Sequence, residues 1–229
     1  MTQAIYKNRF EFFLATQLAI LFGSLLFGYR TFEYTVQPIL FLMNILGGIL
    51  LISKQRKLMW FFILLFTISL FIFGSSMVSR TEGVDTILIR LSIYFLFCLT
   101  VTVSIIKQIW YAKDVNKNVI IGLVSGYISL GFLAFFLFMS IELLNTGAFQ
   151  GVLLQGEDFA STADSIMYYS FITLLTIGYG EIVPTIAIAQ KAAILVGLMG
   201  QFYMVIITAI IVGKYIQQNT SDDNFKIIK

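Results

Sequence analysis

Residues 173–181 read Thr-Leu-Leu-Thr-Ile-Gly-Tyr-Gly-Glu, and the rest of the chain is best interpreted from this stretch. The two glycines, Gly178 and Gly180, let the backbone adopt conformations that a side chain would forbid. With that freedom successive carbonyls can turn toward one axis, while Tyr179 between them points outward and braces the backbone. Thr176 adds a hydroxyl to the row. The stretch therefore predicts oxygens arranged to replace the water shell of a bare cation.

The pattern Thr-x-x-Thr-Ile-Gly-Tyr-Gly-Glu resembles the signature of the potassium channel family. The resemblance implies that Thr176–Gly180 is a selectivity filter, with potassium as the permeant ligand and no other cofactor. The residues implied to coordinate K⁺ are Thr176, Ile177, Gly178 and Tyr179. Because the chain has a single pore segment and the filter needs four, the resemblance also implies a homotetramer in the lipid bilayer. The alternative interpretation is a buried glycine-rich turn in another kind of membrane protein.

The composition favours a membrane protein and argues against several other classes. Hydrophobic residues make up 59% of the 229 residues and charged residues 12%, and the mean hydropathy is +0.90. A soluble domain of this size could not hide so much apolar surface, whereas a bilayer solvates it. With one cysteine and no histidine, neither an internal disulfide nor zinc-type ligation is expected. A formal net charge of +3 is too small to suggest nucleic-acid binding.

Six apolar stretches are long enough to cross a bilayer as helices. They lie near residues 12–29, 36–53, 58–78, 86–106, 119–140 and 188–213. A shorter segment at about 162–175 ends at the Gly-Tyr-Gly stretch, so we expect a re-entrant pore helix, for which Ser161-Thr-Ala-Asp164 has the spacing of a capping box. The expected fold class is therefore an all-α membrane protein with six transmembrane helices, a pore helix and a filter, assembled as a four-fold tetramer.

The charges between these stretches alternate by side. Eleven of the 15 basic residues fall on one side: Lys7, Arg9, Lys54, Arg56, Lys57, Lys107, Lys113, Lys117, Lys214, Lys226 and Lys229. The acidic residues of the opposite side are Glu33, Glu82, Asp85, Glu142, Glu157, Asp158, Asp164 and Glu181. Because basic loops stay in the cytoplasm, we expect a multi-pass protein of the cell membrane with both termini cytoplasmic.

Four residues around the filter are expected to support it: Thr173, Tyr168, Tyr169 and Glu181. In the resemblance, the tyrosine pair takes the place of a tryptophan pair, and ordinary aromatic packing is the alternative. Glu181 takes the place of an aspartate, which changes the flanking hydrogen bonds. With the loop acids it could also form an acidic mouth that concentrates cations. For Glu157 and Asp158 we favour simple solvation, but not for Glu181.

The last span contains a candidate hinge. Gly200 lies 20 residues beyond Gly180, which resembles the hinge glycine on the inner helix of the family. A packing glycine at a tight helix contact is an equal alternative. Met204 and Thr208 follow at i+4 and i+8, so we expect them to share a face with Gly200 and to line the cavity.

The fourth span, near 86–106, departs from the voltage-gated type. It carries one charge, Arg90, where a voltage sensor needs several. We prefer snorkelling or pairing with Asp85 or Glu82 for this residue, and keep a residual sensor charge as the alternative. The expected domains are a four-helix sensor-like domain (1–118), a pore domain (119–217) and a short cytoplasmic tail (218–229). The tail is too short for a ligand-binding domain, and the gating stimulus is not apparent.

These observations together predict a potassium-selective channel with weak or no voltage sensing. Flow would be passive, so no enzyme activity is expected. The alternatives are a poorly selective cation channel on the same scaffold, a potassium transporter subunit and a non-conducting scaffold. One pore segment with an intact motif argues against the transporter, since transporters that resemble this pore usually carry four such segments per chain. An intact filter argues against the scaffold.

Overall fold

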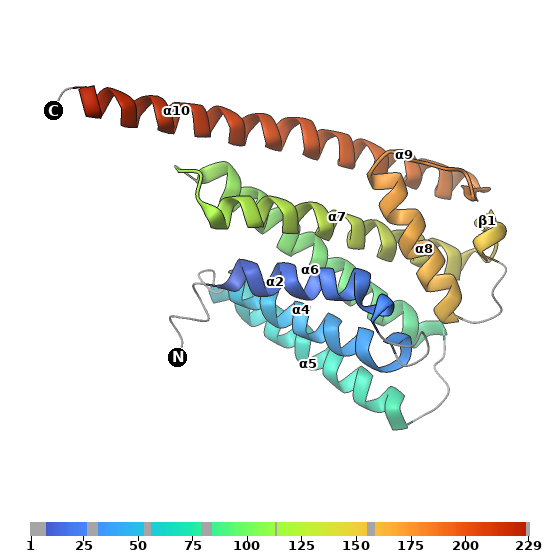
Figure 1. The fold of residues 1–229 in the computed structure, drawn as a ribbon. Coiled ribbons are helices and arrows are strands. Elements are labelled where there is room, and N and C mark those ends of the chain that lie inside the picture. Colours follow the sequence, from blue (N-terminus) through green and yellow to red (C-terminus); the bar gives the residue numbers. More distant parts are fainter. Residues whose placement is uncertain are drawn as a thin grey trace.

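The computed structural model describes residues 8–26, 32–52, 56–78, 84–112, 114–154 and 159–227, and these are mainly helical (Figure 1). The first part contains α2 (Arg9–Phe22), the 3₁₀ turn η1 (Gly23–Leu25), the π-helical turn η2 (Phe32–Val36), α4 (Gln37–Ile52), α5 (Arg56–Val78) and α6 (Val84–Tyr111). The second part contains α7 (Lys117–Leu144), β1 (Phe149–Gly151), η3 (Val152–Leu154), α8 (Phe159–Leu174), β2 (Ile182–Pro184), α9 (Ala187–Phe202), the π-helical turn η4 (Tyr203–Ile207) and α10 (Thr208–Ile227).

Three helical segments of the described chain are long and apolar enough to cross a membrane: Asp85–Tyr111, Lys117–Leu144 and Ala187–Gln218. Two further apolar helices, Gln37–Leu51 and Met59–Leu70, are shorter, and α2 has 14 residues. The chain is therefore an all-α membrane protein in its main features, apart from the short strands β1 and β2. That all six predicted stretches cross the bilayer stays a prediction.

Several element bounds differ from those expected. Helix α8, which covers the expected pore helix, starts at Phe159, upstream of Ser161, so the predicted capping-box residues lie within its first turns. The last helix continues as α10 to Ile227, so most of the predicted tail is helical. The first helix ends at Phe22, earlier than expected, and a 3₁₀ turn follows to Leu25. At α7 the start has a local cause, since the Asn116 side chain accepts a hydrogen bond of 3.2 Å from the Val119 N–H.

Helices α2, α4, α5, α6 and α7 run in alternating directions, and the start of α2 lies at the same end of the molecule as the end of α10 (Figure 1). Helix α6 turns back through the short link 112–116 and packs along α7, and α2 also packs on α7. We call α2, α4, α5 and α6 the four-helix unit, and α7 to α10 the pore module. The four-helix unit thus docks on the pore module of its own chain.

Aromatic rings fill the space that glycines leave between helices. A Cβ on Gly48 would lie 2.5 Å from the Phe97 ring, and one on Gly131 would overlap the Phe171 ring of the pore helix. Some of the polar side chains buried between these helices are paired across them, whereas the hydroxyls of Ser69 and Thr102 have no hydrogen-bond partner in the described chain. The Gln17 amide donates to Ser129 at 2.7 Å, which joins α2 to α7. In a membrane interior such pairing satisfies groups that lipid cannot.

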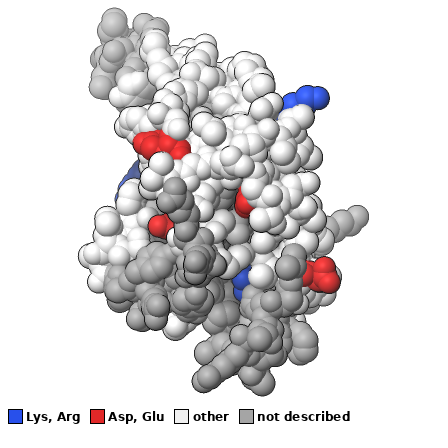
Figure 2. All heavy atoms as spheres, turned by 90° about the vertical axis from the view of Figure 1, so that its right-hand side faces the viewer, with Lys and Arg blue, Asp and Glu red and all other residues white. Residues whose placement is uncertain are grey.

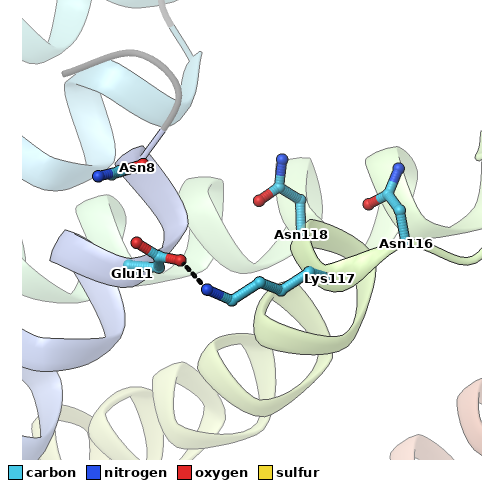
Figure 3. Close-up of a pocket in the computed structure, with 5 residues that line it drawn as sticks. All are labelled: Asn8, Glu11, Asn116, Lys117 and Asn118. Carbon is cyan, nitrogen blue, oxygen red and sulfur yellow. Dashed lines mark hydrogen bonds and ion pairs between the residues drawn. The ribbon is translucent and has the colours of Figure 1, made fainter. Parts of the chain in front are cut away.

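At the end opposite residues 176–180, the four-helix unit and the pore module are joined by charged and polar groups. The Glu11 carboxylate of α2 and the Lys117 ammonium of α7 form an ion pair beside a polar pocket of about 500 Å³ (Figure 3). Lys214 of α10 donates to the carbonyls at the end of α6, with 2.6 Å to Trp110 and 2.7 Å to Ala112. Gln218 of α10 accepts from the Val115 N–H at 3.0 Å.

Candidate functional site at the Gly-Tyr-Gly loop

The loop after α8 folds back on the last turn of that helix. The Thr176 N–H donates to the Thr173 carbonyl at 3.0 Å, and the Ile177 N–H donates to the Ile172 carbonyl at 2.9 Å. Gly178 makes a longer bond of 3.4 Å to the same Ile172 carbonyl. Within the described chain, no hydrogen bond ends on a carbonyl of residues 176–180. The N–H side of the loop therefore faces the pore helix, and its oxygens are available to a ligand.

The sign of φ alternates along this loop. Thr176, Gly178 and Gly180 have φ values of +58°, +57° and +95°, while Ile177 and Tyr179 between them are not in the positive region. When left-handed and right-handed residues alternate, successive N–H groups gather on one side and the carbonyls leave from the other. The alternation is what a row of oxygens along residues 173–181 requires, and that row stays a prediction; the alternation includes Thr176, which sequence alone would not place in the left-handed region.

Thr176 carries the strongest sign of functional strain. It is the only non-glycine residue with positive φ in the described part of the chain. For a β-branched side chain this conformation is a genuine outlier, and such strain persists where the surroundings fix it, typically at binding sites.

The glycines are needed here for conformation and not for space. A Cβ on Gly178 or Gly180 would meet nothing within 4 Å in the single chain. What disfavours an L side chain is the positive φ, which is strained for L residues and costs glycine little.

Residues 175–180 and much of the helical segment Ala187–Gln218 are exposed in the single chain. Tyr179 is 69% exposed and Ile177 46%. The apolar window of Ala187–Gln218 is 22% buried, whereas that of Lys117–Leu144 is 67% buried. Phe202 and Val205 on this helix are 58% and 64% exposed. A continuous apolar face beside an exposed oxygen-rich loop indicates an assembly surface or a lipid-facing surface.

The two tyrosines expected to act as a pair have different surroundings. The Tyr168 hydroxyl donates to the Glu181 carboxylate at 3.5 Å, a long contact behind the loop. Desolvation of the phenol and the nearby Glu181 carboxylate raise the pKa of Tyr168, so it stays protonated as a donor at neutral pH. Tyr169 instead packs against Phe138 and Phe149, with ring centroids 5.1 Å and 5.3 Å away.

Glu181 has an unsatisfied oxygen. Its Oε1 receives the Tyr168 hydroxyl, but its Oε2 is buried without a hydrogen-bond partner in the described chain. The other acids of the expected mouth are not gathered around it. Asp164 is exposed, and Glu157 and Asp158 lie outside the described residues. Among the described residues on this face, the acidic and basic side chains lie apart from one another (Figure 2).

The structure favours packing for Gly200. The residue is buried, and a Cβ there would overlap the Leu174 carbonyl oxygen at the end of α8. Met204 and Thr208 are exposed in the single chain, whereas Gly200 is buried with Tyr203 and Ile207. The π-helical turn Tyr203–Ile207 interrupts the regular α-helical spacing between Gly200 and Thr208, and that Met204 and Thr208 line a cavity stays a prediction.

Two features near the loop escaped sequence reasoning. Gln201 donates to the Thr176 hydroxyl at 3.4 Å and so places an amide beside the start of the Thr176–Gly180 loop. Its signal is visible in retrospect, since a lone glutamine between apolar residues in a span is expected to be functional. The π-helical turn η4 starts three residues after Gly200, and we find no sequence signal for it.

Arg90 lies in α6, six residues after the start of that helix, and is partly exposed. Of its two proposed partners, Asp85 is exposed and Glu82 lies outside the described residues.

Among described residues, no group of three or more His, Cys, Asp or Glu side chains could hold a metal ion.

Comparison with known proteins agrees with this geometry. Residues 127–217 match a family model described as an ion channel. The match covers most of α7, the loop and the inner helix, and leaves the four-helix unit outside. The search of curated proteins and that of solved structures each gave no match. The match and the spanning helices together support an ion-channel domain in a membrane protein.

Proposed function

We propose that the ion-channel domain at residues 127–217 conducts potassium selectively and passively, down its electrochemical gradient. The observation that carries this proposal is the alternating φ at Thr176, Gly178 and Gly180, with no hydrogen bond to the carbonyls of 176–180 from the described chain. A dehydrated potassium ion needs such a row of oxygens, contributed by several chains around an axis.

The coordinating oxygens would be the carbonyls of Thr176, Ile177, Gly178 and Tyr179 and the hydroxyl of Thr176. Helix α8 supports this role because its C-terminal end, with partial negative charge, lies directly below the loop. Gln201 approaches the Thr176 hydroxyl from the cavity side at 3.4 Å. One of the two hydroxyl lone pairs is then occupied by the amide, and the other faces an ion.

Four chains would close the pore through the inner helix and the loop. The exposed apolar face that includes Ile194, Phe202 and Val205 supports this interface. The four-helix unit would stay with its own pore module, since α6 and α2 already pack on α7 and the link 112–116 is short. Each chain would therefore contribute one complete quarter of the channel, with no exchange of four-helix units.

Voltage sensing would be weak. Arg90 is the single charge in the fourth predicted span. One charge moved fully across 100 mV yields about 2.3 kcal/mol, or about 9 kcal/mol for four chains, and a partial movement yields less. The stimulus that opens the channel is not part of this proposal.

A poorly selective cation channel is the second candidate. The long Tyr168–Glu181 contact and the unpartnered Glu181 Oε2 favour it, because they describe a loosely braced outer end of the filter. The potassium-selective channel and the poorly selective channel differ in how well the row of oxygens keeps its spacing when a smaller ion, such as sodium, enters.

Single-channel recording of purified tetramers in planar bilayers tests the proposal. Under bi-ionic conditions with potassium on one side and sodium on the other, we expect the reversal potential to favour potassium. Equal permeability would replace the proposal with the second candidate. Absence of unitary currents, together with slow potassium uptake into vesicles, would point to a transporter.

A further inference from the structure

We propose that the antiparallel pairing of β1 with β2 positions the outer end of the oxygen row, and that Gly151 is the residue that permits it. This inference rests on the proposed channel function. None of the sequence patterns predicted the pairing of β1 with β2. The strand Phe149–Gly151 comes before the pore helix, and Ile182–Pro184 comes directly after Glu181. The two ends of the pore loop are therefore joined to each other.

The pairing is anchored on both sides. In the register, Phe149 lies opposite Pro184, Gln150 opposite Val183, and Gly151 opposite Ile182. Beyond the strands, the Thr185 N–H donates to the Ala148 carbonyl at 2.8 Å. These bonds connect the exit of the filter to the segment that leaves α7.

The β1 side is held by helices α7 and α8. The Glu142 carboxylate accepts from the backbone N–H groups of Gly147 at 2.7 Å and Phe149 at 2.9 Å. The Phe149 ring is 2% exposed and packs between Phe138 of α7 and Tyr169 of α8. Through β1, the outer end of the loop is thereby fixed to two helices that do not belong to the loop.

Gly151 is required for closeness and not for an unusual backbone conformation. It is not among the glycines with positive φ, but a Cβ there would overlap the Glu181 carbonyl oxygen and crowd the Ile182 Cα. A glycine inside a strand often marks such an approach of another backbone. The Glu181 carbonyl is one peptide beyond Gly180, so displacing it displaces the last oxygens of the row.

This pairing also compensates for the weak side-chain brace. The Tyr168–Glu181 contact is 3.5 Å long and leaves Glu181 Oε2 unpartnered. Because the Glu181 side chain is held only loosely, the position of residue 181 depends on the backbone pairing of β1 with β2. We therefore expect the conducting shape of the outer end to depend on β1 more than on Tyr168.

The first test compares Gly151→Ala with Gln150→Ala in the full chain. Both changes lie in β1, but the Gln150 side chain is exposed and its removal leaves the backbone pairing intact. Gly151→Ala is expected to form tetramers and to lose current during sustained opening at least about fivefold faster than wild type, since overpacking costs about 1–3 kcal/mol. Gln150→Ala is expected to match wild type. Equal decay in Gly151→Ala and wild type would overturn the proposal.

The second test locks the pairing. Gln150 and Val183 are opposed and both exposed, so Gln150→Cys with Val183→Cys can form a disulfide across the strands, and the native Cys98 is buried in α6. Oxidation is expected to slow the decay of current several-fold, with reversal by reductant, and Gln150→Cys alone is the control. Unchanged decay in the oxidised double variant would refute positioning by β1.

Hydrogen exchange separates this inference from the channel proposal. In Gly151→Ala the amides of residues 177–183 are expected to exchange at least about tenfold faster than in wild type, whether or not the wild type conducts. Faster amide exchange in Gly151→Ala, together with no potassium current in the wild type, would refute the channel proposal and leave the positioning role standing. If the wild type conducts, and Gly151→Ala changes neither amide exchange nor the decay of the current, the positioning role is refuted and the channel proposal stands.

Discussion

Replacing Gly178 by alanine tests the oxygen row most directly. At φ +57° an L side chain is strained by about 1–2 kcal/mol, and a Cβ at this site has open space in the single chain, so strain is the main cost. Four chains in one ring raise that cost to about 4–8 kcal/mol, which lowers the conducting population by about three to six powers of ten. We expect Gly178→Ala tetramers to carry no measurable potassium current.

Linked tetramers make this prediction quantitative. With one, two, three or four Gly178→Ala copies, the logarithm of the open probability should fall in equal steps, each of about 5- to 30-fold. Gly197→Ala is the matched control, since the same methyl enters helix α9 where nothing lies within 4 Å and alanine is favoured by about 1 kcal/mol. Wild-type conduction from four altered copies, with the tetramer intact by native mass spectrometry, would refute the reasoning.

Three further predictions concern other parts of the molecule. Lys214→Met should lower the free energy of unfolding by about 1–3 kcal/mol, because the carbonyls at the end of α6 lose a charged donor. The control is Lys191→Met at an exposed position, and equal thermal-unfolding midpoints for the two variants would contradict the prediction. Gly200→Ala should cost about 1–3 kcal/mol by overpacking against Leu174, whereas a pure hinge role would change opening and leave the midpoint unchanged. Arg90→Gln should leave the slope of the conductance–voltage curve almost unchanged, and a steep native curve that flattens in this variant would restore the voltage-sensor interpretation.

The sequence was sufficient for those features that depend on local chemistry. The glycines at 178 and 180 predicted the loop, because only their backbone freedom explains the spacing, and the structure gives both residues positive φ. The apolar stretches near 86–106, 119–140 and 188–213 correspond to helices long enough to span a membrane. The pore helix was placed within three residues of its observed start.

What the sequence could not provide depends on contacts between distant segments. The β1–β2 pairing joins residues more than thirty positions apart, and three-residue strands carry no detectable period. The split between Tyr168 and Tyr169 follows from which ring meets Phe138 and Phe149, which is a matter of packing. Gly200 was balanced between hinge and packing because only the position of the Leu174 carbonyl distinguishes them.

The docking of the four-helix unit on its own α7 has a consequence for biogenesis. Because the link 112–116 is short and the Gln17–Ser129 bond lies within one chain, these contacts can form as soon as α7 enters the bilayer. In the proposed tetramer, assembly would begin from chains whose four-helix unit is already packed on α7. Subunit encounter would then be the concentration-dependent step, and a defect that unfolds the four-helix unit would remove its chain before it could enter a mixed channel.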